Sequence, residues 1–176
     1  MPTIFSHPAV PLALGFGLGK KIVSRRLLLA GIAASVLPDL DVVAFSFGIP
    51  YEHEFGHRGF SHSFFFAALV ALLGACGHRW LHCGFGIAFW FLFFSTASHG
   101  ILDAFTNGGL GIAFFWPWSD ARYFARYQLI EVAPISLSHF LSWWGVSVLL
   151  SELRWVWLPC VLMGLGLACV FRNSRK

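Results

Sequence analysis

Histidine and aspartate residues recur in four short motifs of this sequence, each next to an apolar run. The motifs are "SHP" at 6–8, "LPDLD" at 37–41, "HRGFSHS" at 57–63 and "SHGILD" at 98–103. The candidate metal ligands that they supply are His7, Asp39, Asp41, His57, His62, His99 and Asp103. Imidazole and carboxylate groups together suit borderline divalent ions. These residue types predict a divalent metal site, with zinc as the first choice and manganese or iron as alternatives.

The spacing within the motifs decides which side chains can share an ion. His99 and Asp103 are four residues apart, so a helix places both on one face, with Cβ atoms about 5–6 Å apart. A shared metal and a plain His–Asp hydrogen bond between helices fit this pair equally well. Asp39 and Asp41 would point about 200° apart on a regular helix. Pro38 can open that helix, so that both carboxylates face inward or one of them orients a histidine, whereas simple helix capping explains only one.

The motif at 57–63 combines two imidazoles with an arginine. His57 and His62 are five residues apart, a poor helical spacing, but Gly59 permits a turn that brings both to one ion. Arg58 suits an anionic ligand such as phosphate, although an arginine at a membrane boundary can also extend its charge to the interface. We take Asp41 and Arg58 as the candidate catalytic residues. The serines at 61 and 63 are expected to cap the following helix.

Apolar segments must position these motifs. The chain has 176 residues, of which 57% are hydrophobic and 11% charged, against about 25% charged in soluble domains. A spanning helix needs roughly 20 apolar residues, and the runs that come close are 4–19, 27–47, 63–78, 83–103, 135–151 and 155–171. We predict one all-α domain over residues 1–176, a bundle of about four to six transmembrane helices. The stretch 109–118 is expected to be re-entrant or interfacial.

The basic residues predict how this bundle is oriented. Lys20, Lys21, Arg25 and Arg26 follow the first run and Arg79 follows the third, so the positive-inside rule makes this end cytoplasmic. All seven His and Asp candidates then lie at the opposite end. Two spans at 135–151 and 155–171 would also send the basic tail there, against the rule. Either the last run does not span, or the orientation is inverted.

The four motifs resemble those of the YdjM-like family of inner-membrane proteins, which are described as LexA-regulated and as predicted metal-dependent hydrolases. The matching stretches lie in the same order between residues 6 and 119, and are "SHPAV", "LPDLD", "HRGFSHS" and "SHGILDAFTNGGLGIAFFWPWS". The resemblance implies a multi-pass protein of the inner membrane with a metal centre built from the His and Asp residues above. It also implies hydrolytic activity, with a likeness in ligand types to zinc-dependent phospholipases C.

A metal at these residues favours hydrolysis, because a bound ion lowers the pKa of its water to about 7 and polarises phosphoryl or carbonyl oxygens. We expect cleavage of a phosphoester or ester bond in a lipid or lipid-linked substrate, with Arg58 as the phosphate contact. The alternative is a membrane protein that binds or transports metal ions or protons without hydrolysis. Clustering at one face favours a site over a pathway, and the aspartates disfavour a haem or quinone protein. The scattered basic residues predict no nucleic-acid partner.

Overall fold

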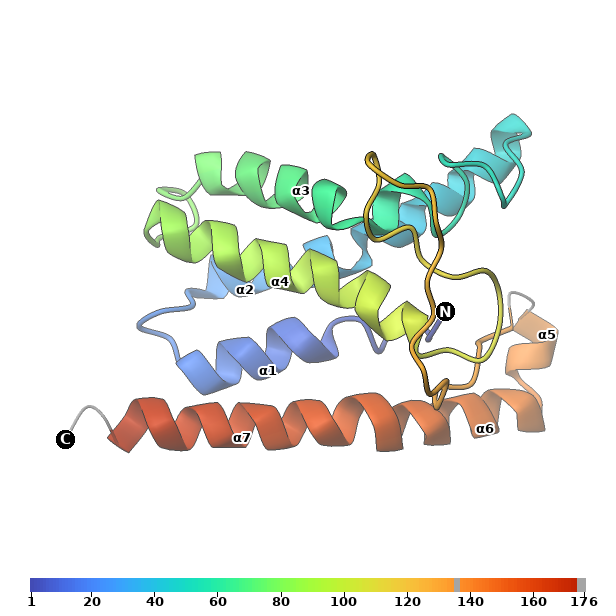
Figure 1. Ribbon diagram of the computed structural model, residues 1–176. Coiled ribbons are helices and arrows are strands. Elements are labelled where there is room, and N and C mark those ends of the chain that lie inside the picture. The colour runs from blue at the N-terminus through green and yellow to red at the C-terminus, as the bar shows by residue number, and fades with distance from the viewer. Residues whose placement is uncertain (135–136, 174–176) are drawn as a thin grey trace.

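The computed structural model describes residues 1–134 and 137–173, and the regular elements within them are helices (Figure 1). The prediction of an all-α protein is confirmed. In chain order the elements are α1 (Ala9–Leu18), α2 (Arg25–Val36), the 3-10 helix η1 (Leu37–Phe47), the 3-10 turn η2 (Phe60–His62), α3 (Phe64–Cys76), α4 (Phe85–Ala104), α5 (Leu137–Phe140), α6 (Trp143–Glu152), the π-helical turn η3 (Leu153–Trp157) and α7 (Leu158–Asn173).

Three helices among the described residues are long and apolar enough to cross a membrane, namely Arg25–Phe47, Phe85–Ala104 and Trp143–Phe171. The predicted count of four to six spans is not reached. Helices α1 and α3 have 10 and 13 residues, which rise only about 15 Å and about 20 Å, against the roughly 30 Å of a hydrocarbon core. The two spans predicted at 135–151 and 155–171 were wrong, because both runs belong largely to one continuous helix.

That continuous helix removes the conflict over the basic tail. Figure 1 shows α6, η3 and α7 running the length of the bundle, so that α7 ends at the same end of the bundle as the α1–α2 and α3–α4 loops. These loops carry Lys20, Lys21 and Arg79, and α2 begins there with Arg25 and Arg26. A single crossing therefore brings the end of the chain's last helix to the basic end, as the positive-inside rule requires.

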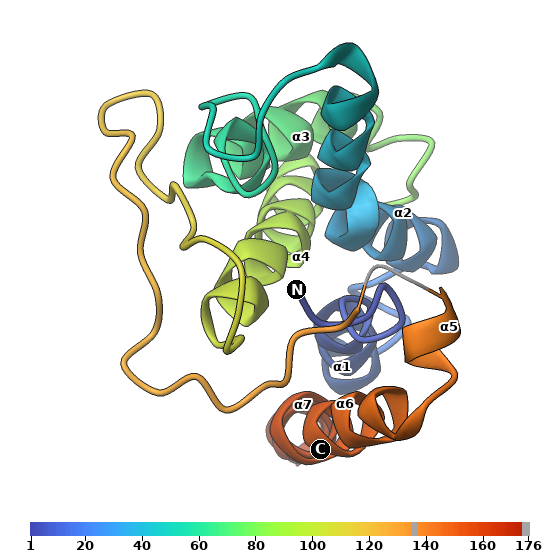
Figure 2. The ribbon, with the colours of Figure 1, turned by 90° about the vertical axis from the view of Figure 1, so that its right-hand side faces the viewer.

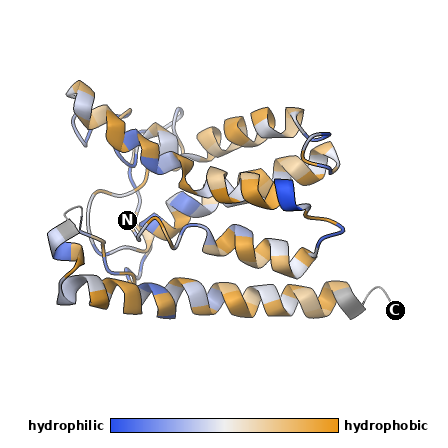
Figure 3. Ribbon diagram, turned by 180° about the vertical axis from the view of Figure 1, so that it is seen from behind, coloured by the Kyte–Doolittle hydropathy of each residue, from blue (hydrophilic) through white to orange (hydrophobic). Residues whose placement is uncertain are grey.

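The two halves of the bundle differ in chemistry. Towards the basic end, α2, α3 and α4 enclose an apolar core of small and large side chains, among them Leu27, Ala71, Ala88 and Leu92. Figure 3 shows apolar residues along the helices and hydrophilic ones mainly at the ends. The opposite end, where α1 and α3 begin and α4 ends, contains the motif residues and is named here the polar end.

Irregular chain covers the polar end (Figures 1 and 2). The segments 48–59 and 105–134 pass over it, and backbone hydrogen bonds join them to each other and to α3, such as Phe64 N–H to Phe114 O and Ala113 N–H to Arg58 O. The stretch 109–118, predicted to be re-entrant or interfacial, is irregular and packs Trp116 against Phe60 and Phe65. This cover shields the motif residues from solvent.

Candidate metal centre

The two aspartates of "LPDLD" turn to different partners. After Val36 the helix continues as 3-10 rather than α, with three residues per turn, so residues two apart point about 240° apart. Asp39 Oδ1 lies 3.2 Å from Nε2 of His99, whereas Asp41 Oδ1 lies 2.6 Å from Nδ1 of His57. Asp39 therefore faces His99 of α4, whereas Asp41 faces His57 and His62 of the segment before α3.

The first of two His/Asp groups is fully buried. Its members, named here the inner group, are Asp39, His62, His99 and Asp103, and their ligand atoms all lie within 4.8 Å of one another. Asp103 Oδ2 is 3.5 Å from His62 Nε2. This contact joins α4 to η2, the turn before α3. Gly100 allows this close approach, because a Cβ there would lie 2.7 Å from the His62 carbonyl oxygen. The inner group thus draws its ligand atoms from three segments of the chain.

Each imidazole of the inner group is oriented by its other nitrogen. Nδ1 of His99 lies 2.7 Å from the carbonyl oxygen of Ser35, which can only accept, so Nδ1 carries the proton and Nε2 keeps its lone pair. Nδ1 of His62 lies 3.2 Å from Asp41 Oδ2, and this likewise directs Nε2 at the group. Metal-binding histidines are held in this way by a carbonyl or carboxylate partner.

His7 lies directly beside the inner group. Its ring stacks on that of His99 with 3.6 Å between centroids, and its Nε2 is 3.8 Å from both Asp39 Oδ2 and Asp103 Oδ1. Burial, together with the neighbouring His99, lowers the pKa of His7 to about 3. The imidazole is therefore neutral at pH 7 and can donate a lone pair to a cation.

His62 has the opposite electrostatic environment. Burial alone would lower its pKa, but the neighbouring carboxylates of Asp103 and Asp41 outweigh burial and raise the pKa of His62 to about 9. In the protein without an ion, a proton on His62 balances part of the carboxylate charge. A cation at the same position would replace that proton, as metal binding generally does at histidine ligands.

The second group, named here the outer group, contains Asp41, His57 and His62 and shares His62 with the first. Asp41 is its hydrogen-bond centre. Besides the His57 and His62 contacts, its carboxylate accepts from Ser61 Oγ at 2.5 Å and from the Arg58 backbone N–H at 3.2 Å. Ser63 caps α3 as predicted, whereas Ser61 donates to Asp41 instead.

Arg58 is buried among protein acceptors. It is 0% exposed, so it neither extends to an interface nor offers its charge at the surface. Its guanidinium donates to the carbonyls of Gly108 and Leu110 at 2.8 Å each and to Thr106 Oγ1 at 2.9 Å. Its Nε lies 3.2 Å from Asp103 Oδ2. Each of its nitrogens therefore faces a protein acceptor, and four of its five N–H groups are directed at these acceptors.

The backbone around Arg58 also differs from expectation. Arg58 itself has a positive φ of 65°, a conformation that costs of order 1–3 kcal/mol for such a residue and that occurs often at functional sites. Gly59, predicted to permit the turn, has φ −87° and ψ −127°, and it takes part in the turn bonds Gly59 N–H to Gly56 O and His62 N–H to Gly59 O. A glycine is needed there for space, because a Cβ would lie 2.1 Å from the Glu54 carbonyl oxygen.

Unpaired buried atoms gather at the inner group. Over the described part of the chain, nine buried side-chain nitrogen and oxygen atoms make no hydrogen bond, and all belong to His7, Asp39, Arg58, His62, His99 and Asp103. A buried polar atom without a partner costs about 1–3 kcal/mol, and more when charged. Apart from Arg58 Nε, which faces Asp103 Oδ2, these atoms are carboxylate oxygens and imidazole nitrogens. Their chemistry fits a divalent cation bound among them.

Sequence reasoning missed the residues that support these ligands. Thr106 binds Arg58 and also donates to the Asp103 carbonyl at 2.7 Å, and the Ser35 carbonyl orients His99. Neither residue type nor spacing marks a serine carbonyl as a partner. Glu54 lies outside both groups and accepts from Trp116 Nε1 at 3.0 Å.

The fold and site together define a class, an all-helical membrane protein with a buried His/Asp cluster at one end of its bundle. The chain belongs to the YdjM inner membrane protein family, whose model matches residues 1–176. It is 50% identical over 164 residues to inner membrane protein YbcI of Escherichia coli (strain K12). The aligned stretch covers 93% of this chain and 95% of that protein. No solved structure matches the chain. The family resemblance and the inner-membrane localisation are therefore confirmed.

Proposed function

We propose that this protein is a membrane-bound metal-dependent hydrolase that cleaves a phosphoester or ester bond of a lipid or lipid-linked substrate. The observation that carries the proposal is the set of buried ligand atoms of Asp39, His62, His99 and Asp103, which lie within 4.8 Å of one another and include atoms that make no hydrogen bond. A protein that buries such atoms unpaired gains stability when a cation binds them. Helices apolar enough to cross a membrane carry three of the four residues.

The inner group, with His7 beside it, would hold the ion. Zinc is the first choice, because two or three imidazoles with carboxylates match its usual ligands. A bound divalent ion would lower the pKa of a water molecule to about 7 and polarise a phosphoryl or carbonyl oxygen. A catalytic zinc needs three protein ligands, so the group has side chains to spare for binding the attacking water by hydrogen bonds.

The two residues predicted to be catalytic are given supporting roles in this proposal. Asp41 accepts the Nδ1 proton of His62 and thereby keeps Nε2 of that imidazole directed at the ion. Arg58 holds Asp103 through its Nε and places a fixed positive charge beside the carboxylates. Such partners hold a metal ligand in its binding orientation. Removing one typically lowers metal affinity 10–100-fold.

Transport of metal ions or protons is the less favoured function. A pathway needs ionisable or polar groups that continue across the membrane. Towards the basic end, α2, α3 and α4 pack apolar side chains such as Leu27 and Leu92. The buried hydroxyls of Ser95 and Thr96 donate to carbonyls of their own helix. This supports a site at one end over a route through the bundle.

The test compares bound metal and hydrolysis in the purified protein. We expect the wild type to contain a transition metal by elemental analysis and His62→Ala to lose most of it, whereas the control His78→Ala, in the α3–α4 loop, keeps it. The metal-loaded protein is then screened against phosphodiester, phosphomonoester and carboxylic ester lipids. Equal metal content in wild type and His62→Ala would refute the metal site. If the protein bound metal but cleaved none of these lipid classes, the proposed hydrolase activity would be refuted and only metal binding would stand.

A further inference from the structure

Glu152 is a carboxylate buried in an apolar helix, outside both His/Asp groups. It is 2% exposed and lies within the helix Trp143–Phe171, one of those able to cross a membrane. Ionisable groups in such helices are costly unless they are paired, and they mark functional positions by default. The partners of Glu152 therefore indicate what it does.

All the hydrogen-bond partners found for this carboxylate belong to the first six residues. Glu152 Oε1 accepts from the backbone N–H of Thr3, and Oε2 accepts from Thr3 Oγ1 and Ser6 Oγ at 2.7 Å each. Trp157 Nε1, one turn further along the same helix, donates to Ser6 Oγ at 3.2 Å. The long helix thus holds the turn that immediately precedes His7.

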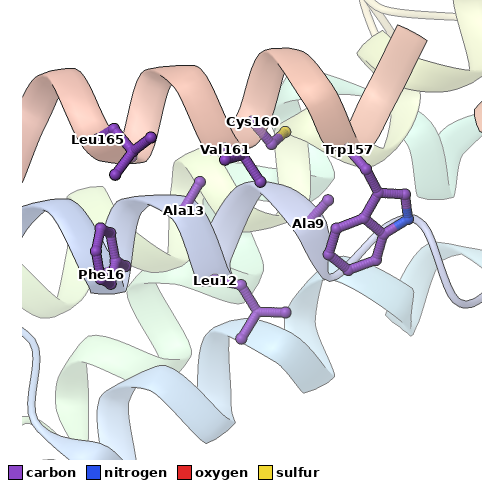
Figure 4. A pocket seen from close by; sticks show the side chains of 9 residues that line it. Ala9, Leu12, Ala13, Phe16, Trp157, Cys160, Val161 and Leu165 are labelled. Atoms are coloured by element: carbon purple, nitrogen blue, oxygen red, sulfur yellow. The ribbon is translucent and has the colours of Figure 1, made fainter. Parts of the chain in front are cut away.

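The helix geometry fits this contact. The π-helical turn η3 begins at Leu153, directly after Glu152, and such turns are often found at functional sites. Figure 4 shows that Trp157 lies beside Ala9 at one end of an apolar cavity of about 280 Å³ between α1 and α7. Beyond this cavity the helices come close, since a Cβ on Gly17 would lie 2.5 Å from Leu167 Cβ. The polar contact is therefore at the site end of an otherwise apolar interface.

The held turn leads straight into the candidate centre. Backbone bonds from Ser6 N–H to Thr3 O and from Ala9 N–H to Ser6 O close the turn on both sides of His7. His7 is 0% exposed, and no hydrogen bond fixes either of its ring nitrogens. Its position against Asp39 and Asp103 thus depends on stacking on His99 and on the anchoring of its backbone.

We propose that Glu152 is a positioning residue that anchors the residue 3–6 turn, so that the His7 imidazole faces the carboxylates of the metal centre. The inference rests on the proposed metal site and assigns Glu152 an effect that passes through His7. A carboxylate suits this role because it accepts several hydrogen bonds at once, from a backbone N–H and two hydroxyls.

The test is a double-mutant cycle on zinc affinity in the full-length protein in detergent. We expect Glu152→Ala to weaken zinc binding about 10–100-fold, as loss of a ligand's supporting partner does. Glu152→Gln keeps an acceptor oxygen and should retain most of the affinity. In a His7→Ala background, Glu152→Ala should change affinity by less than about twofold, the ordinary error of additivity.

Glu131→Ala is the matched control. Its carboxylate also accepts from a serine of the long helix, Ser147 Oγ at 2.6 Å, but it does not touch the His7 turn, so zinc affinity should be unchanged. If Glu152→Ala fails to fold by circular dichroism, Ser6→Ala takes its place in the cycle. Equal losses with and without His7, or no loss at all, would overturn the positioning role. A wild type that binds no zinc would instead overturn the metal site itself.

Discussion

The inner and outer His/Asp groups share His62, yet they are built differently. In the inner group, both oxygens of Asp39 and of Asp103 make no hydrogen bond. In the outer group, Asp41 accepts from two imidazoles, a serine hydroxyl and a backbone N–H. The inner carboxylates are left with unmet bonding capacity, whereas the outer carboxylate has its capacity filled by protein donors.

This difference separates binding from support. A carboxylate that already accepts several hydrogen bonds gains little by contacting a cation. Asp39 and Asp103 have charged or imidazole neighbours at 3.2 Å but accept no hydrogen bond, so they gain more. His62 links the two because Nδ1 faces Asp41 and Nε2 faces Asp103. Hence both groups contain residue types that can bind a metal ion, but only the inner group has carboxylate oxygens that accept no hydrogen bond from the protein. The predictions below test that distinction, beginning with the largest effect.

The strongest test removes one inner carboxylate. Asp39→Asn keeps the side-chain shape but removes its charge, so we expect the protein to lose most of its bound metal, as measured by elemental analysis. Asp120→Asn, a loop aspartate outside both groups, is the control and should keep its metal. Unchanged metal content in a folded Asp39→Asn protein would mean that the inner group is not the binding site.

Removing the metal should cost stability, and the cost should depend on the inner group. With free ion at about 100 times its Kd, binding contributes about 2.7 kcal/mol, so a chelator should lower the free energy of unfolding by this amount. Denaturant unfolding in detergent, followed by circular dichroism, measures it. In Asp39→Asn the chelator should have no effect. A similar chelator effect in both proteins would place the ion elsewhere.

Removal of the outer carboxylate's charge should weaken binding without abolishing it. Asp41→Asn retains one acceptor oxygen but loses its charge, which loosens the orientation of His62. We expect zinc affinity to fall about 10–100-fold, measured by competition with a chelating indicator. A loss as complete as that of Asp39→Asn would show that Asp41 is itself a ligand, and the division into two groups would be wrong.

The smallest effect is expected at the two serines around His62. Ser61→Ala removes a donor to Asp41 and should cost about 1 kcal/mol of stability with a drop in zinc affinity of less than about tenfold. Ser63→Ala removes the cap of α3 and should cost a similar amount of stability but leave zinc affinity unchanged. If both variants bound zinc equally well, Ser61 would have no part in orienting the outer group.

Some features could be predicted because they depend on local sequence alone. The apolar runs and the low charge content led to an all-helical membrane protein, since only helices or closed barrels satisfy backbone hydrogen bonds in lipid. The four-residue spacing of His99 and Asp103 placed both on one face of α4, where both belong to the inner group that could hold a metal ion. The sequence also predicted that the motifs gather at one end of the bundle, because the chain reverses direction between successive helices. This reversal occurs however many of the helices span the membrane.

Other features were mispredicted because a distant segment decided them. The polar residues Ser151, Glu152 and Arg154 interrupt the last apolar run, and this pattern is typical of a loop between two helices. The chain stays helical because Glu152 finds donors in Thr3 and Ser6, about 150 residues earlier in the sequence. No local pattern contains that information.

The division is similar at the site. By itself, the sequence determined which side chains can bind a divalent ion and that helices bring them to one end, because ligand chemistry and helical periodicity are local properties. Only the tertiary structure decided that Arg58 turns inward to Asp103, that Asp41 meets His57 and His62, and that Glu152 accepts hydrogen bonds from Thr3 and Ser6. These outcomes depend on which hydrogen-bond donors and acceptors meet once distant segments pack and exclude water.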